Sequence, residues 1–283
     1  MRGSSGPAVI ELKRALRKAL GEDAPGMPID ERFDEATESA LRTWQASVGL
    51  VADGIAGPRT RAALGCASAS GLAMRVNPDL VGQLFPFTGS ACVAENLAYV
   101  SSALAEFGLT EERLVCAALA TIRAETEGFV PIAERPSSYN TLPGEAPFGV
   151  YDGKLGNRAP GDGARYRGRG YVQLTGRHNY ARYGELLGIP LLENPDSACS
   201  PEVAACLLAA YLDTNRARLS KALDTEREDL IEARRVVNGG SHGLQRFQET
   251  YTRAKELLAS FGGSLFDTSS PQGQPDGLRD DQA

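Results

Sequence analysis

Three glutamates fall within ten residues of the segment "ATIRAETEGFVPIAERPSSYN", which spans residues 120–140. Glu125 and Glu127 lie at the end of a predicted helix, and Glu134 follows in a predicted loop. Two carboxyl groups in different environments can divide the work of a general acid and a general base, as they do in glycosidases. The competing interpretation is that all three are solvated surface charges.

The helix that ends near Glu125 predicts a buried position for this carboxyl. Apolar residues recur on one face of "LTEERLVCAALATIRAETEGF", and Glu125 falls on that face, three residues after Ile122. Gly128 is the predicted C-cap, so Glu125 would also lie near the negative end of the helix dipole. Both effects would raise the pKa of Glu125, which suits a general acid. A structural pairing with an arginine such as Arg123 is the alternative.

The other two glutamates differ in their expected surroundings. Glu127 points about 200° around the helix from Glu125, so we expect it to be solvated. Glu134 lies beside Arg135 in a loop, where exposure and that neighbour favour the charged form that a base needs. The intervening chain could span up to roughly 30 Å, so sequence spacing does not fix the distance between the two carboxyls.

A second informative segment, "GARYRGRGYVQLTGRHNYARYG", spans residues 163–184. Its alternating arginines and aromatic residues could bind RNA, but the strip is short and the chain carries a net charge of −6. We therefore expect no nucleic-acid partner. Gly168 and Gly170 indicate that the backbone approaches another group closely.

Three polar side chains follow these glycines. Gln173, Thr175 and Asn179 offer amide and hydroxyl groups. Such groups suit hydrogen bonds to sugar hydroxyls and to a water molecule.

The remaining composition narrows the class of protein. The chain has 283 residues, of which 42% are hydrophobic and 23% charged, as in ordinary globular proteins. No apolar run approaches the roughly 18 residues of a transmembrane helix. The five cysteines are scattered without a CxxC pair, so neither a disulfide framework nor a zinc site is indicated. The N-terminus does not read as a signal peptide, so we expect synthesis in the cytoplasm and action elsewhere only after release or secretion by another system.

The chain divides into a compact N-terminal module, a linker, a helical domain and a tail predicted to be disordered. These parts are predicted at residues 1–65, 66–77, 78–261 and 262–283. The module predicts three helices, the second capped by Asp34 and the third beginning at Pro58. The expected fold class is mainly α.

The module resembles the peptidoglycan-binding domain 1 family. The resemblance rests on "FDEATESALRTWQASVGLVADGIAGPRTRAAL", with its F-x-x-x-T, W-Q, G-L-x-x-D-G and G-x-x-T-x-x-A-L elements. It implies a module that holds peptidoglycan glycan strands or their stem peptides. A purely structural N-terminal cap is the alternative.

The helical domain resembles glycoside hydrolase family 19, which includes class I chitinases and related phage endolysins. The resemblance rests on "AETEGF", "YRGRGYVQLTGRHNY" and "RRVVNGGSHGLQRF", although Ala124 replaces the usual histidine. It implies a lysozyme-like, mostly helical fold with a sugar-binding cleft.

The same resemblance implies roles for individual residues. Glu125 would be the general acid, Glu134 the general base, and Thr175 the residue that positions the attacking water. The expected substrate contacts are Tyr171, Gln173, Asn179, Asn238 and Arg246.

Together these features predict an inverting hydrolase of the β-1,4 bonds of peptidoglycan, such as an endolysin or an antibacterial effector. We expect a monomer that needs no metal or organic cofactor. The alternatives are a chitinase and a non-catalytic wall-binding protein.

Overall fold

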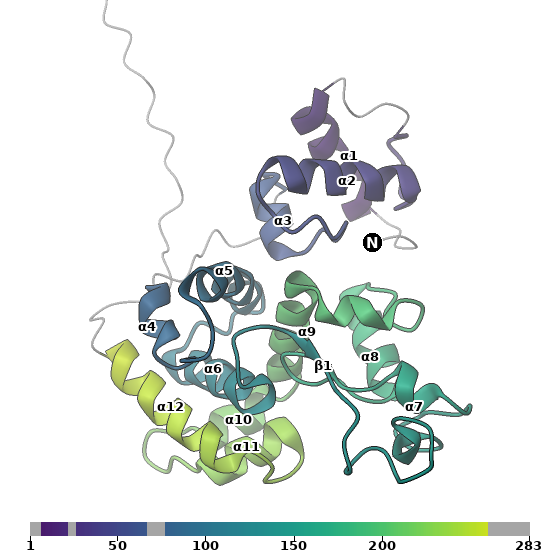
Figure 1. The fold of residues 1–283 in the computed structure, drawn as a ribbon. Helices are drawn as coiled ribbons and strands as arrows, with labels where there is room; N and C mark the ends of the chain where they lie inside the picture. The colour runs from purple at the N-terminus through teal and green to yellow at the C-terminus, as the bar shows by residue number, and fades with distance from the viewer. Residues whose placement is uncertain (1–6, 22–26, 67–76, 260–283) are drawn as a thin grey trace, which may run out of the picture.

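The computed structural model describes residues 7–21, 27–66 and 77–259, and it is mainly helical, as predicted (Figure 1). The N-terminal module contains α1 (Pro7–Leu20), α2 (Glu35–Ser47) and α3 (Pro58–Ala63). The helical domain contains α4 (Pro78–Gly82), α5 (Ser90–Glu106), α6 (Glu112–Thr126), α7 (Asp162–Arg165), α8 (Arg177–Leu187), α9 (Pro201–Thr214), α10 (Arg216–Ala222), α11 (Leu230–Asn238) and α12 (Leu244–Ala259). Two short 3₁₀ helices are η2 (Gly149–Tyr151) and η3 (Pro195–Cys199).

None of the described helices is long and apolar enough to span a membrane. Residues 67–76 of the predicted linker and the predicted tail lie outside the described residues.

The N-terminal module has a small apolar core of its own. Leu12, Leu16, Leu41 and Trp44 are buried together between α1 and α2. The predicted cap of α2 is confirmed, because the Asp34 carboxylate accepts a hydrogen bond from the Thr37 backbone N–H at 2.9 Å. The three-helix prediction therefore holds for the described part of the module.

The helical domain is built around α6. This helix is buried over nearly its whole length, from Leu114 to Ala124, because it packs against α12 and also contacts α9, α10 and α11. The α5 helix packs against α9 (Figure 1). This packing fixes the position of the C-terminal end of α6, which carries Glu125.

A two-stranded antiparallel sheet lies beside the end of α6. It pairs β1 (Ile132–Ala133) with β2 (Arg169–Gly170), so that Ala133 lies opposite Arg169. The next residue, Glu134, donates its backbone N–H to the Gly168 carbonyl at 2.8 Å. The two segments singled out in the sequence are thereby brought together.

Candidate active site

Glu125 lies in the last turn of α6, half-buried, with 11% of its side chain exposed. Arg234 Nη2 donates to Glu125 Oε1 at 2.7 Å, and Arg234 itself is fully buried. Burial raises the pKa of Glu125, and the opposing effect of the Arg234 guanidinium is smaller. The predicted direction of the pKa shift is confirmed, whereas the arginine partner is Arg234 and not Arg123.

The end of α6 is set by Glu127 rather than by the predicted cap Gly128. Glu127 has φ 59°, and its backbone N–H donates to the Arg123 carbonyl. A non-glycine residue in such a conformation costs about 1–3 kcal/mol, a kind of strain that occurs often at functional sites. The Glu127 side chain is 64% exposed and pairs with Arg246 at 2.7 Å, which fits its expected solvated position.

Arg234 was not among the residues selected from the sequence. It lies on α11, and its Nε and Nη2 donate to the His242 carbonyl at 2.8 and 2.7 Å. Asn238 Nδ2 contacts the same carbonyl at 3.3 Å. Arg234 could have been found from its position beside the apolar residues Ala233 and Val237, which indicates that it lies on the buried face of its helix. A buried arginine needs an anionic partner, so it would have been a candidate partner for a buried glutamate.

Glu134 is held by three hydrogen-bond donors. Its Oε1 accepts from Asn140 Nδ2 at 2.9 Å and from the Tyr151 hydroxyl at 2.8 Å, and its Oε2 accepts from the Gly168 N–H at 3.0 Å. Burial, and the bond to Glu134, raise the pKa of Tyr151, so the phenol stays a donor. Among the described contacts, Asn140, Tyr151 and Gly168 position this carboxyl, and Arg135 does not.

The glycines of the second segment are needed for close approach, as predicted. A Cβ on Gly168 would lie 2.8 Å from Gln173 Oε1 and 3.2 Å from Glu134 Oε2. A Cβ on Gly170, which has φ 80°, would lie 2.8 Å from the Ala198 carbonyl oxygen. The Gln173 amide donates to the Ile132 and Gly170 carbonyls, both at 3.0 Å, and so ties the two strands together.

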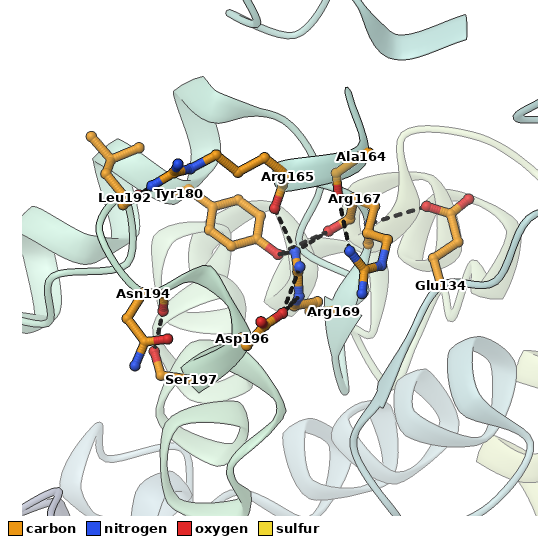
Figure 2. A network of polar contacts seen from close by, with 11 residues as sticks. Glu134, Ala164, Arg165, Arg167, Arg169, Tyr180, Leu192, Asn194, Asp196 and Ser197 are labelled. Atoms are coloured by element: carbon orange, nitrogen blue, oxygen red, sulfur yellow. Dashed lines mark hydrogen bonds and ion pairs between the residues drawn. The ribbon is translucent and has the colours of Figure 1, made fainter. Parts of the chain in front are cut away.

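A buried arginine supports the strand beside Glu134 (Figure 2). Arg169 is 2% exposed, and its guanidinium contacts Asp196 and the Tyr180 hydroxyl while also donating to the carbonyls of Arg165 and Arg167. The Tyr180 hydroxyl in turn donates to the Arg167 carbonyl. The guanidinium of Arg169 is thus buried and hydrogen-bonded within the protein, so it is not available to bind RNA.

A cleft of about 950 Å³ joins the two carboxyls. It is lined by Glu125, Thr126, Ile132, Ala133, Glu134, Arg135, Pro136, Phe148, Arg167 and Gln173. The cleft thus contains the predicted acid, the predicted base and one of the predicted substrate contacts.

The other predicted site residues lie outside the lining of this cleft. The Thr175 hydroxyl donates to the Gln173 carbonyl at 2.8 Å, and Asn179 Nδ2 donates to the Thr175 carbonyl at 2.8 Å. Asn238 supports the turn at His242, and Arg246 lies on α12. These four residues keep their predicted roles as predictions.

Tyr171 requires a correction. It is 0% exposed, and its hydroxyl donates to Asn96 Oδ1 at 2.6 Å. Its ring lies in the core beside Phe129, with ring centroids 6.1 Å apart. Tyr171 therefore cannot contact a bound sugar here, because its ring and hydroxyl are both engaged in the interior.

Comparison with known proteins identifies relatives for both parts of the chain. Residues 5–64 match the family described as "Putative peptidoglycan binding domain". A Haemophilus influenzae protein, "Glycosyl hydrolase family 19 domain-containing protein", is 30% identical over 104 residues, which cover 36% of this chain and 48% of that protein. An Arabidopsis thaliana endochitinase is 34% identical over 98 residues, or 34% of this chain and 32% of the enzyme. The chain thus spans less than half the length of either relative.

A solved structure is similar over a longer stretch. Chitinase C from Streptomyces griseus superposes with a TM-score of 0.49 and 22% identity, covering 66% of this chain and 94% of that chain. Both resemblances found in the sequence are confirmed: the chain carries a segment that matches the peptidoglycan binding domain family, followed by a helical part similar to glycosyl hydrolase family 19 proteins.

Proposed function

We propose that the protein is a cell-wall hydrolase that cleaves β-1,4 glycosidic bonds of peptidoglycan by an inverting acid/base mechanism. The observation that carries the proposal is the pairing of Glu125 and Glu134 in one cleft with different surroundings. Glu125 is half-buried with a raised pKa, whereas Glu134 is an acceptor for three fixed donors. This is the division that acid/base glycoside hydrolysis requires.

In the proposed reaction, Glu125 donates its proton to the glycosidic oxygen as the bond from that oxygen to the anomeric carbon breaks. Glu134 takes a proton from a water molecule, whose oxygen attacks the anomeric carbon from the opposite face. Thr175 gives the water a second partner. Gln173, Asn179, Asn238 and Arg246 are proposed to contact the glycan. These steps balance without a metal ion or an organic cofactor.

The N-terminal module is the reason for proposing peptidoglycan as the substrate. A peptidoglycan-binding module would raise the local concentration of wall glycan near the cleft. We propose that the protein acts as a monomer on the cell wall, which it reaches through release or secretion by another system.

Chitin is the second candidate substrate, since one relative is an endochitinase. Both polymers have β-1,4-linked N-acetylated sugars, so the same two carboxyls would serve. A non-catalytic wall-binding protein is disfavoured, because an intact acid, base and cleft would have no use in it.

The substrate is tested by incubating the full chain with purified peptidoglycan and, separately, with colloidal chitin. We expect the turbidity of the peptidoglycan suspension to fall and new reducing ends to appear, and we expect the Glu125→Gln variant to produce neither. Release of oligosaccharides from chitin alone would replace peptidoglycan by chitin as the substrate. Inactivity on both polymers, with wall binding retained, would favour the non-catalytic reading.

Replacing Arg234 with Met is expected to shift the alkaline limb of the pH profile. The Arg234 guanidinium lowers the pKa of Glu125, so its removal raises that pKa further. The acid then stays protonated to higher pH, and the alkaline limb of kcat/KM should move to higher pH. Arg234→Lys, which keeps the charge, is the matched control and should move the limb less. An unmoved limb in Arg234→Met would show that Glu125 is not the titrating acid.

A further inference from the structure

The segment between α2 and α3 lies against the helical domain. Ile55 in this segment is 5% exposed, and it packs with the domain residues Tyr180, Leu191 and Val203. The apolar core of the module does not include it. Since its apolar neighbours belong to the domain, the burial of Ile55 indicates contact between the two parts.

A buried carboxyl lies at the centre of this contact. Glu202, in the first turn of α9, is 3% exposed. Its Oε1 accepts from the Arg59 backbone N–H and its Oε2 from the Thr60 hydroxyl, both at 3.1 Å. Gln45 Nε2 donates a hydrogen bond to the Thr60 hydroxyl oxygen at 3.2 Å, so the Thr60 hydroxyl is free to donate its own hydrogen bond to Glu202. Both partners of this domain carboxyl come from the module.

Gly57 makes the close approach of Glu202 possible. A Cβ at this position would overlap the carboxyl group of Glu202. Gly57 does not have a positive φ, so an alanine at this position would be compatible with the local backbone conformation of the module. The glycine is therefore required by the contact and not by the local turn.

Further polar contacts surround this centre. The Val51 N–H donates to the Tyr99 hydroxyl at 3.1 Å, and the Arg59 guanidinium lies 4.4 Å from the centroid of the Tyr99 ring. Arg61 pairs with Glu106 at 2.5 Å. The Ser200 hydroxyl donates to the Asp53 carboxylate. The contact thus combines a buried apolar residue, a buried carboxyl and a polar rim, the composition of a specific interface.

We infer that the N-terminal module and the helical domain work as one docked unit, held by the seating of Gly57, Arg59 and Thr60 on Glu202 and of Ile55 in the domain core. Docking fixes the orientation of the module relative to the catalytic cleft. It also forms a groove of about 1170 Å³ whose lining includes Arg42, Asp53 and Ile55 from the module and Glu185, Ile189 and Leu191 from the domain. This inference concerns the arrangement of the chain and stands whether or not the proposed hydrolysis is correct.

The docked unit is expected to loosen as the pH rises. Burial raises the pKa of Glu202 to about 7 from an ordinary value of 4.5, which exposure on undocking would restore. A carboxyl with a raised pKa stabilises the docked state fully below pH 4.5, and this contribution is lost as the pH rises to about 7. Between pH 5.5 and 7.5 the docking constant should fall roughly twentyfold. The charged or titratable groups that interact with Glu202 are Asp53 and Arg59 from the module, Tyr99 from α5 and Cys206 from α9. Arg61 and Glu106 act on the neighbouring Cys206.

Amide hydrogen exchange of the full chain, measured by NMR, tests the inference. The backbone N–H groups of Val51 and Arg59 donate to Tyr99 and Glu202, acceptors in the domain, so their protection reports docking. At pH 5.5 we expect both to be protected, and we expect Gly57→Ala to reduce that protection about tenfold or more. Gly82→Ala is the matched control, because a Cβ on Gly82 meets nothing within 4 Å.

Glu202→Gln separates the pH effect from the contact itself. The amide cannot ionise, so protection at Val51 and Arg59, corrected for the intrinsic exchange rate, should stay nearly constant from pH 5.5 to 7.5. The wild-type protection should fall over that interval. Amides of α2 serve as the check that the module stays folded in Gly57→Ala. Unprotected Val51 and Arg59 amides in the wild type would overturn the inference, and so would unchanged protection in a folded Gly57→Ala variant.

Discussion

Replacing Glu125 with Gln is expected to lower the rate of glycan hydrolysis by roughly 10²–10⁴-fold, the usual contribution of a general acid. The amide has nearly the same shape as the protonated carboxyl, and its oxygen can still accept from Arg234 Nη2. It cannot donate the proton that the leaving oxygen needs. The melting temperature and the circular dichroism spectrum should therefore stay close to those of the wild type, while the release of reducing ends nearly stops.

Glu127→Gln is the matched control for this experiment. Glu127 lies two residues further on, but its side chain is 64% exposed, pairs with Arg246 and is not part of the cleft lining. We expect Glu127→Gln to keep activity within a few-fold of the wild type. An active Glu125→Gln variant beside an inactive Glu127→Gln variant would reverse the assignment of the acid.

Replacing Glu134 with Gln is expected to cause a loss of similar size, roughly 10²–10⁴-fold in kcat. An amide cannot take a proton from water at neutral pH. Its NH₂ group would also face a donor at whichever carboxyl oxygen position it occupies, since Asn140, Tyr151 and the Gly168 N–H all donate to Glu134. The variant is compared with the wild type by steady-state kinetics on a soluble oligosaccharide.

Glu145→Gln supplies the control for the base, because Glu145 is an exposed glutamate of the same loop region. It should retain nearly full activity. Tyr151→Phe should cause an intermediate loss, since it removes one of three donors and leaves the carboxylate in place. Wild-type kcat in Glu134→Gln would mean that another group activates the water.

Local spacing was sufficient to predict the surroundings of individual helices. The apolar face of α6 placed Glu125 in a half-buried position, and Asp34 was identified as a cap from its residue type. The glycines at positions 168 and 170 indicated close backbone approach, which the structure confirms. The helix face and the cap depend on neighbours within one or two turns of the chain, and the close approach was indicated by the glycine residue type alone, although the groups approached include Glu134 and Ala198, which are distant in the chain.

Contacts between distant segments could not be predicted in this way. Arg234 is 109 residues from Glu125, and nothing in the periodicity of either helix joins them. Tyr171 is buried in the apolar core, and its hydroxyl donates a hydrogen bond to Asn96, 75 residues earlier. Glu202 and Thr60 are 142 residues apart. The partners of these groups depend on tertiary packing, which a single sequence does not display.

The stereochemistry of the first product tests the central claim most directly. If Glu134 activates a water molecule, the attack inverts the anomeric carbon, and hydrolysis of a β-1,4 bond yields the α-anomer first. Proton NMR of a soluble oligosaccharide digest, recorded before mutarotation, distinguishes the anomers. We predict an initial excess of the α-anomer. An initial β-anomer would show retention and would contradict both the role of Glu134 as a base and the proposed mechanism.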